Sequence, residues 1–173
     1  MTDNSLSTHM NDRCVAIPEI GLELRVCTPP SFVGKGLELI ETINASGYGP
    51  PLHRHSETEV FHVLQGRYLF EVDGERFEAK MGDTVVANGG VPHRFVNIDS
   101  CPSKQLVMIV PGFDAFAFFT QLGLAMKNGR LENDAKLAFS TQWGVDFLGP
   151  PLQASSTMTA ASEADRCVSP GAR

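Results

Sequence analysis

The sequence predicts an all-β fold, a sandwich or barrel of short strands, followed by one or two short C-terminal helices. Between about residues 14 and 110, apolar and polar residues alternate over short runs, which is the pattern of half-buried strands. Gly, Pro, Asn and Asp separate these runs, as is typical of turns. After Pro111 and Gly112 the apolar residues change to a spacing that favours amphipathic helices.

Eight short runs are candidate strands, a number that suits a sandwich or barrel. In chain order they cover residues 22–26, 37–43, 59–64, 67–73, 76–79, 84–87, 93–98 and 105–110. Asp73 and Gly74 lie between two of these runs. An Asp-Gly pair favours a two-residue hairpin turn, because both central positions of that turn take positive φ. We therefore expect a β-hairpin over residues 67–79.

Two candidate helices follow the strands, within residues 113–142. The first contains Phe116 and Phe119 and continues to Met126, with apolar residues at helical spacing. The second begins near Asn133 and ends near Gln142. We expect the first helix to lay its aromatic side chains over the sheet.

Composition limits what the chain can be. Its 173 residues suit one domain, which we expect over residues 14–150, between disordered polar ends at residues 1–13 and 151–173. The formal net charge is −6 and there is no basic run, which argues against nucleic acid as a partner. The sequence contains no apolar stretch long enough to span a membrane and no secretory signal pattern. We therefore expect a soluble, cytoplasmic protein.

The segment from residue 53 to residue 62, HRHSETEVFH, contains three histidines and two glutamates. Alternate residues of a strand face the same side. His53 and His55 can therefore direct two imidazoles toward one point. On the next predicted strand, Glu59 and His62 differ in parity, so we expect His62 to point away from Glu59.

A third imidazole comes from a later segment, in which Gly89 and Gly90 favour a tight turn before His93. Three neutral imidazoles and one carboxylate form a coherent ligand set for a divalent transition metal: Fe, Mn, Ni, Co, Cu or Zn. Such a set leaves one or two coordination positions open, which permits chemistry at the metal. The alternative is a polar surface strip, since exposed strands often carry His and Glu.

At this point the sequence resembles the cupin superfamily, which has two motifs. The first, G-x5-H-x-H-x3/4-E-x6-G, is matched in full by Gly47, His53, His55, Glu59 and Gly66. The second, G-x5-P-x-G-x2-H-x3-N, is matched by Gly82, Gly90, His93 and Asn97, with Asn88 at the position of the motif proline. The substitution affects a turn and not a ligand. The resemblance covers about residues 36–110 and implies a jelly-roll barrel, a double-stranded β-helix, with one metal held by His53, His55, Glu59 and His93.

Residues 49–97, followed by PGFDAFAFFTQLG and GVDFLGPPL, are similar to single-domain quercetinase-like cupins. This second resemblance implies an oxidoreductase, a metal-dependent dioxygenase that acts on a phenolic or enolic small molecule. Glu59 would then be both a metal ligand and the general base for the substrate hydroxyl. The residues expected to line an apolar substrate pocket are Phe61, Val63, Phe95, Phe116 and Phe119.

Two other functions remain open. A non-redox metal-dependent cupin enzyme, such as an isomerase, cyclase or lyase, would use the same metal only to polarise a carbonyl or enolate. A small-ligand-binding cupin would have no catalytic step. By analogy with other cupin barrels, we also expect a homodimer, in which residues 14–30 are candidates for strand pairing between subunits.

Overall fold

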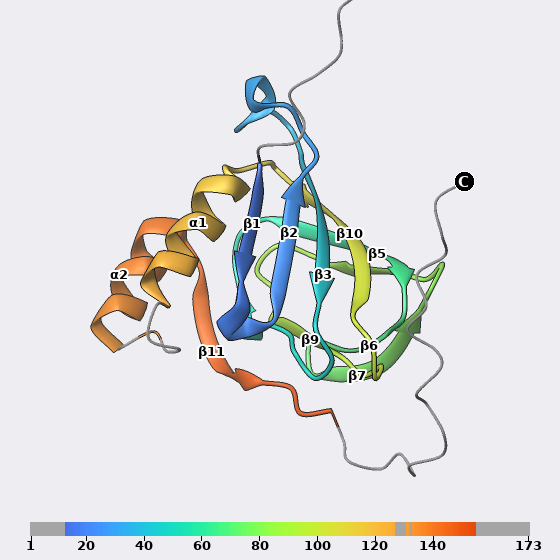
Figure 1. The fold of residues 1–173 in the computed structure, drawn as a ribbon. Helices are drawn as coiled ribbons and strands as arrows, with labels where there is room; N and C mark the ends of the chain where they lie inside the picture. The colour runs from blue at the N-terminus through green and yellow to red at the C-terminus, as the bar shows by residue number, and fades with distance from the viewer. Residues whose placement is uncertain (1–12, 127–130, 132, 155–173) are drawn as a thin grey trace, which may run out of the picture.

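A computed structural model describes residues 13–126, 131 and 133–154. Two antiparallel sheets face each other and form a jelly-roll barrel (Figure 1). In spatial order, the six-stranded sheet contains β1 (Cys14–Ile17), β2 (Leu22–Val26), β3 (Glu38–Asn44), β10 (Ser103–Val110), β5 (Thr58–Gln65) and β8 (Thr84–Ala87). The five-stranded sheet contains β11 (Asp146–Pro151), β4 (Pro51–Arg54), β9 (His93–Asn97), β6 (Arg67–Val72) and β7 (Glu75–Lys80). The predicted all-β class is confirmed.

The core lies between the two sheets. Along β5, Phe61 and Val63 are buried. On the facing sheet, Phe70 and Phe95 lie opposite each other on β6 and β9, and both are buried. The ring centroids of Phe61 and Phe95 are 5.6 Å apart, so aromatic side chains join the two sheets through the middle of the barrel.

The predicted hairpin is also confirmed. β6 pairs with β7, with Val72 opposite Glu75. Asp73 and Gly74 have φ values of 52° and 81°, as a two-residue hairpin turn requires.

Two helices follow the barrel, α1 (Ala115–Ala125) and α2 (Asn133–Trp143). The side chain of Asp114 caps α1 by accepting a hydrogen bond from the backbone N–H of Ala117 at 3.1 Å. α1 lies beside β1, at the edge of the six-stranded sheet, and α2 lies on the far side of α1 (Figure 1). Phe118 joins them, with its ring centroid 5.1 Å from that of Phe139 on α2.

Three strands were missed in the sequence: β1, β4 and β11. β1 and β4 have only four residues each, and β11 ends in Gly-Pro-Pro, which is a turn signal by local criteria. All three form because a neighbouring strand pairs with them. Two short 3₁₀ turns, Pro18–Ile20 and Pro30–Phe32, complete the described secondary structure.

The predicted disordered ends lie mostly outside the described residues. Within the described part, Arg13 donates a hydrogen bond to the carbonyl of Thr28 at 2.9 Å, and Leu152 is buried. Among the described residues, every helix is too short or too polar to cross a bilayer.

Candidate metal centre

Strand pairing brings the predicted ligands together from both sheets. His53 on β4 lies opposite His93 on β9, and their ring centroids are 4.4 Å apart. His55 follows directly after β4, and Glu59 lies near the start of β5. One ligand atom from each of the four residues can be chosen so that all four lie within 4.8 Å of one another. We call these four residues the His/Glu cluster.

Backbone carbonyls orient two of the imidazoles. The Nδ1–H of His53 donates to the carbonyl of Pro51 at 2.8 Å, and the Nδ1–H of His93 donates to the carbonyl of Val91 at 2.9 Å. A carbonyl only accepts hydrogen bonds, so the proton of each neutral ring is on Nδ1. The lone pair of each Nε2 is therefore available, as in metal-binding histidines.

Glu59 is in the middle of the cluster. Its Oε2 is 3.0 Å from Nε2 of His93 and 3.6 Å from Nε2 of His55. Because the Nδ1 proton of His93 is already used, Nε2 and the carboxylate oxygen are both acceptors when His93 is neutral. Two acceptors at this distance need a positive charge between them, which is either a proton or a metal cation.

A tight turn before β9 supports the ligand loop. The N–H of Gly90 donates to the carbonyl of His55 at 2.6 Å, with Gly90 at a φ of 81°. A side chain at Gly89 would clash, because a Cβ there would lie 2.1 Å from the carbonyl oxygen of Ser56. Asn88, which replaces the motif proline, accepts a hydrogen bond from the N–H of Val91 at 3.0 Å. The turn therefore forms without the proline.

The protonation of the cluster is strongly perturbed. Burial, together with the smaller effect of the nearby His93, lowers the pKa of His53 to about 4. Burial opposes ionisation of Glu59, but hydrogen bonds and charges from His55 and His93 outweigh it and hold the pKa of Glu59 well below its usual range. For His55, burial lowers the pKa, while Glu59 and Glu57 more than compensate and raise it. Glu59 is therefore ionised and His53 is neutral near neutral pH, which is the state that a metal requires.

The cluster fits a divalent transition metal. Ligand atoms that share a metal at about 2.1 Å lie at most about 4.2 Å apart. The observed cluster would need only small side-chain movements to reach that spacing. Nitrogen and carboxylate ligands suit several first-row metals.

Three of the predicted pocket residues lie on the barrel wall. Phe61 and Val63 share a face of β5 with Glu59, and Phe95 shares a face of β9 with His93. The centroid of the Phe61 ring is 6.2 Å from that of His93. Val63 is completely buried and lies farther along the strand.

The other two predicted pocket residues are on α1. The guanidinium carbon of Arg13 lies 5.5 Å from the centroid of the Phe116 ring. The Phe119 ring packs edge-on against Phe118, with centroids 4.9 Å apart. Their role in a pocket stays a prediction.

Two residues near the cluster were missed in the sequence. Phe147 on β11 lies opposite His53 and therefore shares its face, but β11 itself was not predicted. Glu38 on β3 is completely buried, and neither of its carboxylate oxygens has a hydrogen-bond partner among the described residues. Ile109 lies opposite Glu38 on one side and Glu59 on the other, so the two carboxyl groups are in the same row of the barrel wall. The only sign of Glu38 in the sequence was that it begins a run of alternating polar and apolar residues.

The remaining polar neighbours lie outside the cluster. Nδ1 of His62 is 2.9 Å from Oγ1 of Thr84 on the outer face, as its parity predicted. Arg54 points outward to Asp146. The amide of Asn97 donates to the backbone carbonyls of Asn44 and Cys101, so Asn97 is structural.

Comparisons with known proteins agree with this architecture. The cupin domain family matches residues 39–109. Over 86 residues the chain is 35% identical to the uncharacterized protein MJ1618 of Methanocaldococcus jannaschii, a match that covers 49% of this chain and 69% of that protein.

Two solved structures show the same fold. An RmlC-like cupin from Shewanella frigidimarina has a TM-score of 0.54 at 19% identity, covering 64% of this chain and 93% of that one. KdgF from Halomonas sp. has a TM-score of 0.52 at 20% identity, covering 58% and 87%. With both sequence motifs, the jelly-roll barrel and these matches in agreement, the chain belongs to the cupin superfamily.

Proposed function

We propose that this cupin is a metal-dependent oxidoreductase, a dioxygenase that acts on a phenolic or enolic small molecule. The observation that carries the proposal is the convergence of three imidazoles and one carboxylate, with ligand atoms within 4.8 Å, beside an aromatic wall. The quercetinase-like resemblance of the sequence supports the reaction class.

The metal ligands in this proposal are Nε2 of His53, Nε2 of His55, Nε2 of His93 and Oε2 of Glu59. A divalent transition metal bound there supplies Lewis acidity, which lowers the pKa of a coordinated substrate oxygen, and a redox-active one also permits reaction with O₂. The Pro51 and Val91 carbonyls hold two of the rings in orientation, which limits the reorganisation needed for binding.

Glu59 is also the proposed proton acceptor. Its lowered pKa keeps the carboxylate ionised and able to accept a hydrogen bond from a substrate hydroxyl, and transfer of the proton would require the metal to make that hydroxyl more acidic. His93 and His55 contact the same carboxylate oxygen, and they stabilise its negative charge between turnovers.

The aromatic wall provides substrate selection. Phe61 and Phe95 would contact the flat face of an aromatic or enolic substrate and exclude water from it. Val63 is proposed to line the pocket farther along β5, and Phe116 and Phe119 are proposed to contribute from α1. Phe147 is added to this set because it shares a face with His53.

Elemental analysis tests the metal site first. We would compare the wild type with a His53→Ala, His93→Ala double variant and with His62→Ala, all expressed with the candidate metals present. About one metal per chain in the wild type and in His62→Ala, and none in the double variant, is the expected result. Equal metal content in all three proteins would refute the site.

Oxygen uptake then tests the reaction. Consumption of O₂ with a flavonol or another enol, lost in the double variant, is expected of a dioxygenase. Turnover of the same compound at an unchanged rate without O₂ would instead identify a non-redox isomerase, cyclase or lyase. Metal and ligand binding without turnover would leave a binding protein.

The sequence is the basis for the proposals on domain organisation, location and oligomeric state. We propose a single domain over residues 14–150, a cytoplasmic location, and a homodimer that takes a small-molecule substrate.

A further inference from the structure

Glu38 is a buried carboxyl group whose role the fold does not explain. It begins β3, it is completely buried, and neither of its carboxylate oxygens has a hydrogen-bond partner among the described residues. Most buried polar groups in proteins are hydrogen-bonded, because an unpaired one destabilises the fold. Glu38 is therefore a candidate for contact with a molecule that binds inside the barrel.

The polar groups around Glu38 do not satisfy it. Nη2 of Arg13 is 3.8 Å from Oε1 of Glu38 and 3.6 Å from Oδ1 of Asp114, and both distances are too long for a hydrogen bond. The guanidinium donates instead to the carbonyl of Thr28 at 2.9 Å and lies against the ring of Phe116. The Thr28 hydroxyl has one proton and can bond only one carboxylate oxygen. At least one oxygen of Glu38 thus remains available.

Other buried polar groups of the barrel have a partner or can find one. Asn44, also on β3, accepts a hydrogen bond from the hydroxyl of Tyr68 at 3.1 Å. The side chains of Thr42 and Gln105 have no partner among the described residues, but they lie directly opposite each other. A rotation of either side chain can therefore pair them. Glu38 has the apolar Ile109 opposite it, so no such rotation is open to it on that strand.

The protonation of Glu38 indicates what it can bind. Burial raises the pKa of its carboxyl group, and Asp114 adds to this effect, although Thr28 and Arg13 oppose it. The raised pKa favours the protonated form, which offers an O–H donor as well as an acceptor oxygen. Such a group suits a neutral hydroxyl or carbonyl better than a charged partner.

Glu38 lies in the same row of the barrel wall as the metal ligand Glu59. Ile109 is between them, opposite Glu38 on β3 and opposite Glu59 on β5. At about 5 Å per step, the Cβ atoms of the two glutamates are about 10 Å apart. Both side chains are directed toward the interior by the alternation of their strands. Two long side chains at this separation can contact opposite ends of one small molecule.

We propose that Glu38 is a second substrate-contacting residue, which binds a hydroxyl or carbonyl group on the side of the substrate that faces away from the metal. The assignment rests on the proposed function, because it places one substrate oxygen at the His/Glu cluster. Substrates would then be small molecules with two separated oxygen groups, one held at the metal and a neutral one held by Glu38. Phe116, which lies against Arg13 next to Glu38, would border the same end of the substrate.

The binding of two flavonols to the zinc-loaded protein tests this contact, because Zn²⁺ is not redox-active and leaves the bound compound intact. 3-Hydroxyflavone has only the oxygens expected at the metal, whereas kaempferol has further hydroxyls on both rings. Isothermal titration calorimetry on the full chain gives Kd for each compound. We expect the wild type to bind kaempferol at least about tenfold more tightly than 3-hydroxyflavone.

Two substitutions at Glu38 separate a polar contact from a packing role. Glu38→Leu removes the polar atoms and should bring the ratio of the two Kd values close to one. Glu38→Gln keeps a donor and an acceptor and should retain most of the preference for kaempferol. Replacement of an unpaired buried polar group by an apolar one is generally tolerated, and far-UV circular dichroism should show that the variants are folded.

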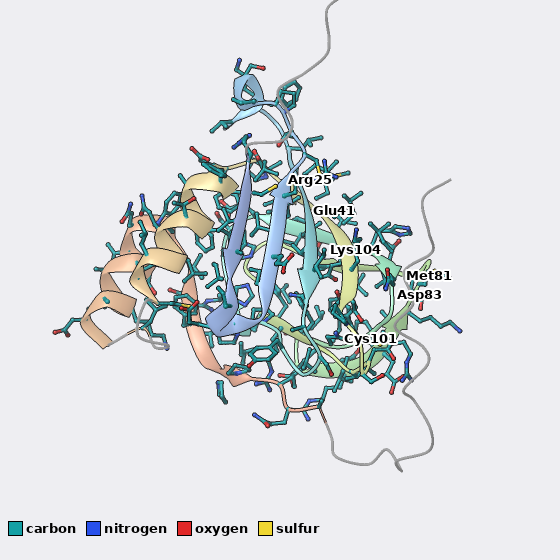
Figure 2. The ribbon with its side chains drawn as sticks, in the orientation of Figure 1. Arg25, Glu41, Met81, Asp83, Cys101 and Lys104 are labelled. Carbon is teal, nitrogen blue, oxygen red and sulfur yellow. The ribbon has the colours of Figure 1, made fainter. Side chains whose placement is uncertain are left out.

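The matched control is Glu41→Leu, on the outer face of the same strand. Glu41 is 3.7 Å from Arg25 and 3.4 Å from Lys104, and Figure 2 shows the three side chains in succession across β2, β3 and β10. The substitution removes the same carboxyl group from outside the barrel. The preference for kaempferol should therefore equal that of the wild type.

An unchanged preference for kaempferol in Glu38→Leu would overturn the assignment. Similar affinities of the two flavonols in the wild type, or failure of both to bind, would overturn it as well. Oxygen uptake with a redox-active metal separates this result from the proposed function. Selective binding that depends on Glu38 without O₂ consumption would refute the dioxygenase alone, whereas O₂ consumption with equal binding of both flavonols would refute only the contact with Glu38.

Discussion

Removal of one histidine ligand should abolish most of the stabilisation that a metal provides. His53→Ala is the most informative change, because His53 is neutral near neutral pH, with its pKa lowered to about 4. The substitution therefore removes a ligand without removing a charge. Its Nδ1 bond to the carbonyl of Pro51 is also lost.

The expected magnitude follows from linkage. At a free metal concentration 100 times Kd, binding stabilises the wild-type fold by about 2.7 kcal/mol. For a chain of this size, that corresponds to a rise in Tm of roughly 5 to 10 °C. Loss of a group that only hydrogen-bonds to a metal ligand costs about 10- to 100-fold in metal affinity, so loss of a ligand should cost at least the upper value. The same metal concentration would then stabilise His53→Ala by only about 0.4 kcal/mol.

Differential scanning fluorimetry of metal-free protein, with and without added Zn²⁺, measures both shifts. Each protein is compared with and without metal, so a difference in stability between the metal-free proteins does not affect the measured shift. His62→Ala is the control, since His62 contacts Thr84 on the outer face, and it should retain the full shift. An equal shift in His53→Ala and the wild type would refute the assignment of the cluster.

Three further results are expected. Metal affinity should fall about tenfold per pH unit below the raised pKa of His55, because a proton on His55 competes with the metal. Glu57 helps to raise that pKa, so Glu57→Gln should move the fall in affinity to lower pH. A calorimetric pH series in which the fall does not move would contradict the role of Glu57. Phe61→Ala should lower the free energy of unfolding by about 3 to 5 kcal/mol, because the ring is buried. Phe77→Ala, at a ring that is 39% exposed, should cost less in urea titrations, and equal losses would argue against the packing described. Burial raises the pKa of Glu38 above 4.5, so the folded state holds this proton more tightly than the unfolded chain, and stability is lost as the pH rises through the folded pKa. Glu38→Gln should therefore gain stability relative to the wild type as the pH rises, and a difference in Tm that does not change with pH would refute the raised pKa of Glu38.

Much of the candidate site was predictable because its signals are local. His53 and His55 share a face through the two-residue period of an extended chain, and the same parity separates Glu59 from His62. The hairpin at Asp73 and Gly74 depends only on the φ preferences of two residues. Spacing of this kind can be interpreted from the sequence without knowledge of the rest of the fold.

The neighbours of the site were not predictable in the same way. Phe147 lies beside His53 only because β11 pairs with β4 across more than 90 positions of the chain. β4 and β11 have weak local strand signals and exist through that pairing. Sequence periodicity states which residues of a strand share a face, but it does not state which strand lies next to it.

Periodicity also fails to choose a face when both faces are apolar. In β3 the alternation of Leu39 and Ile43 with Glu38 and Ile40 fits either orientation. The structure turns Glu38 and Ile40 inward and leaves Leu39 outside. The sequence by itself determined the barrel class and the turns through local conformation, and it indicated the four residues of the His/Glu cluster through strand parity together with the spacing of the two cupin motifs. Only the tertiary structure decided the buried carboxyl of Glu38 and the position of Phe147, because long-range strand pairing sets which side of each strand is covered.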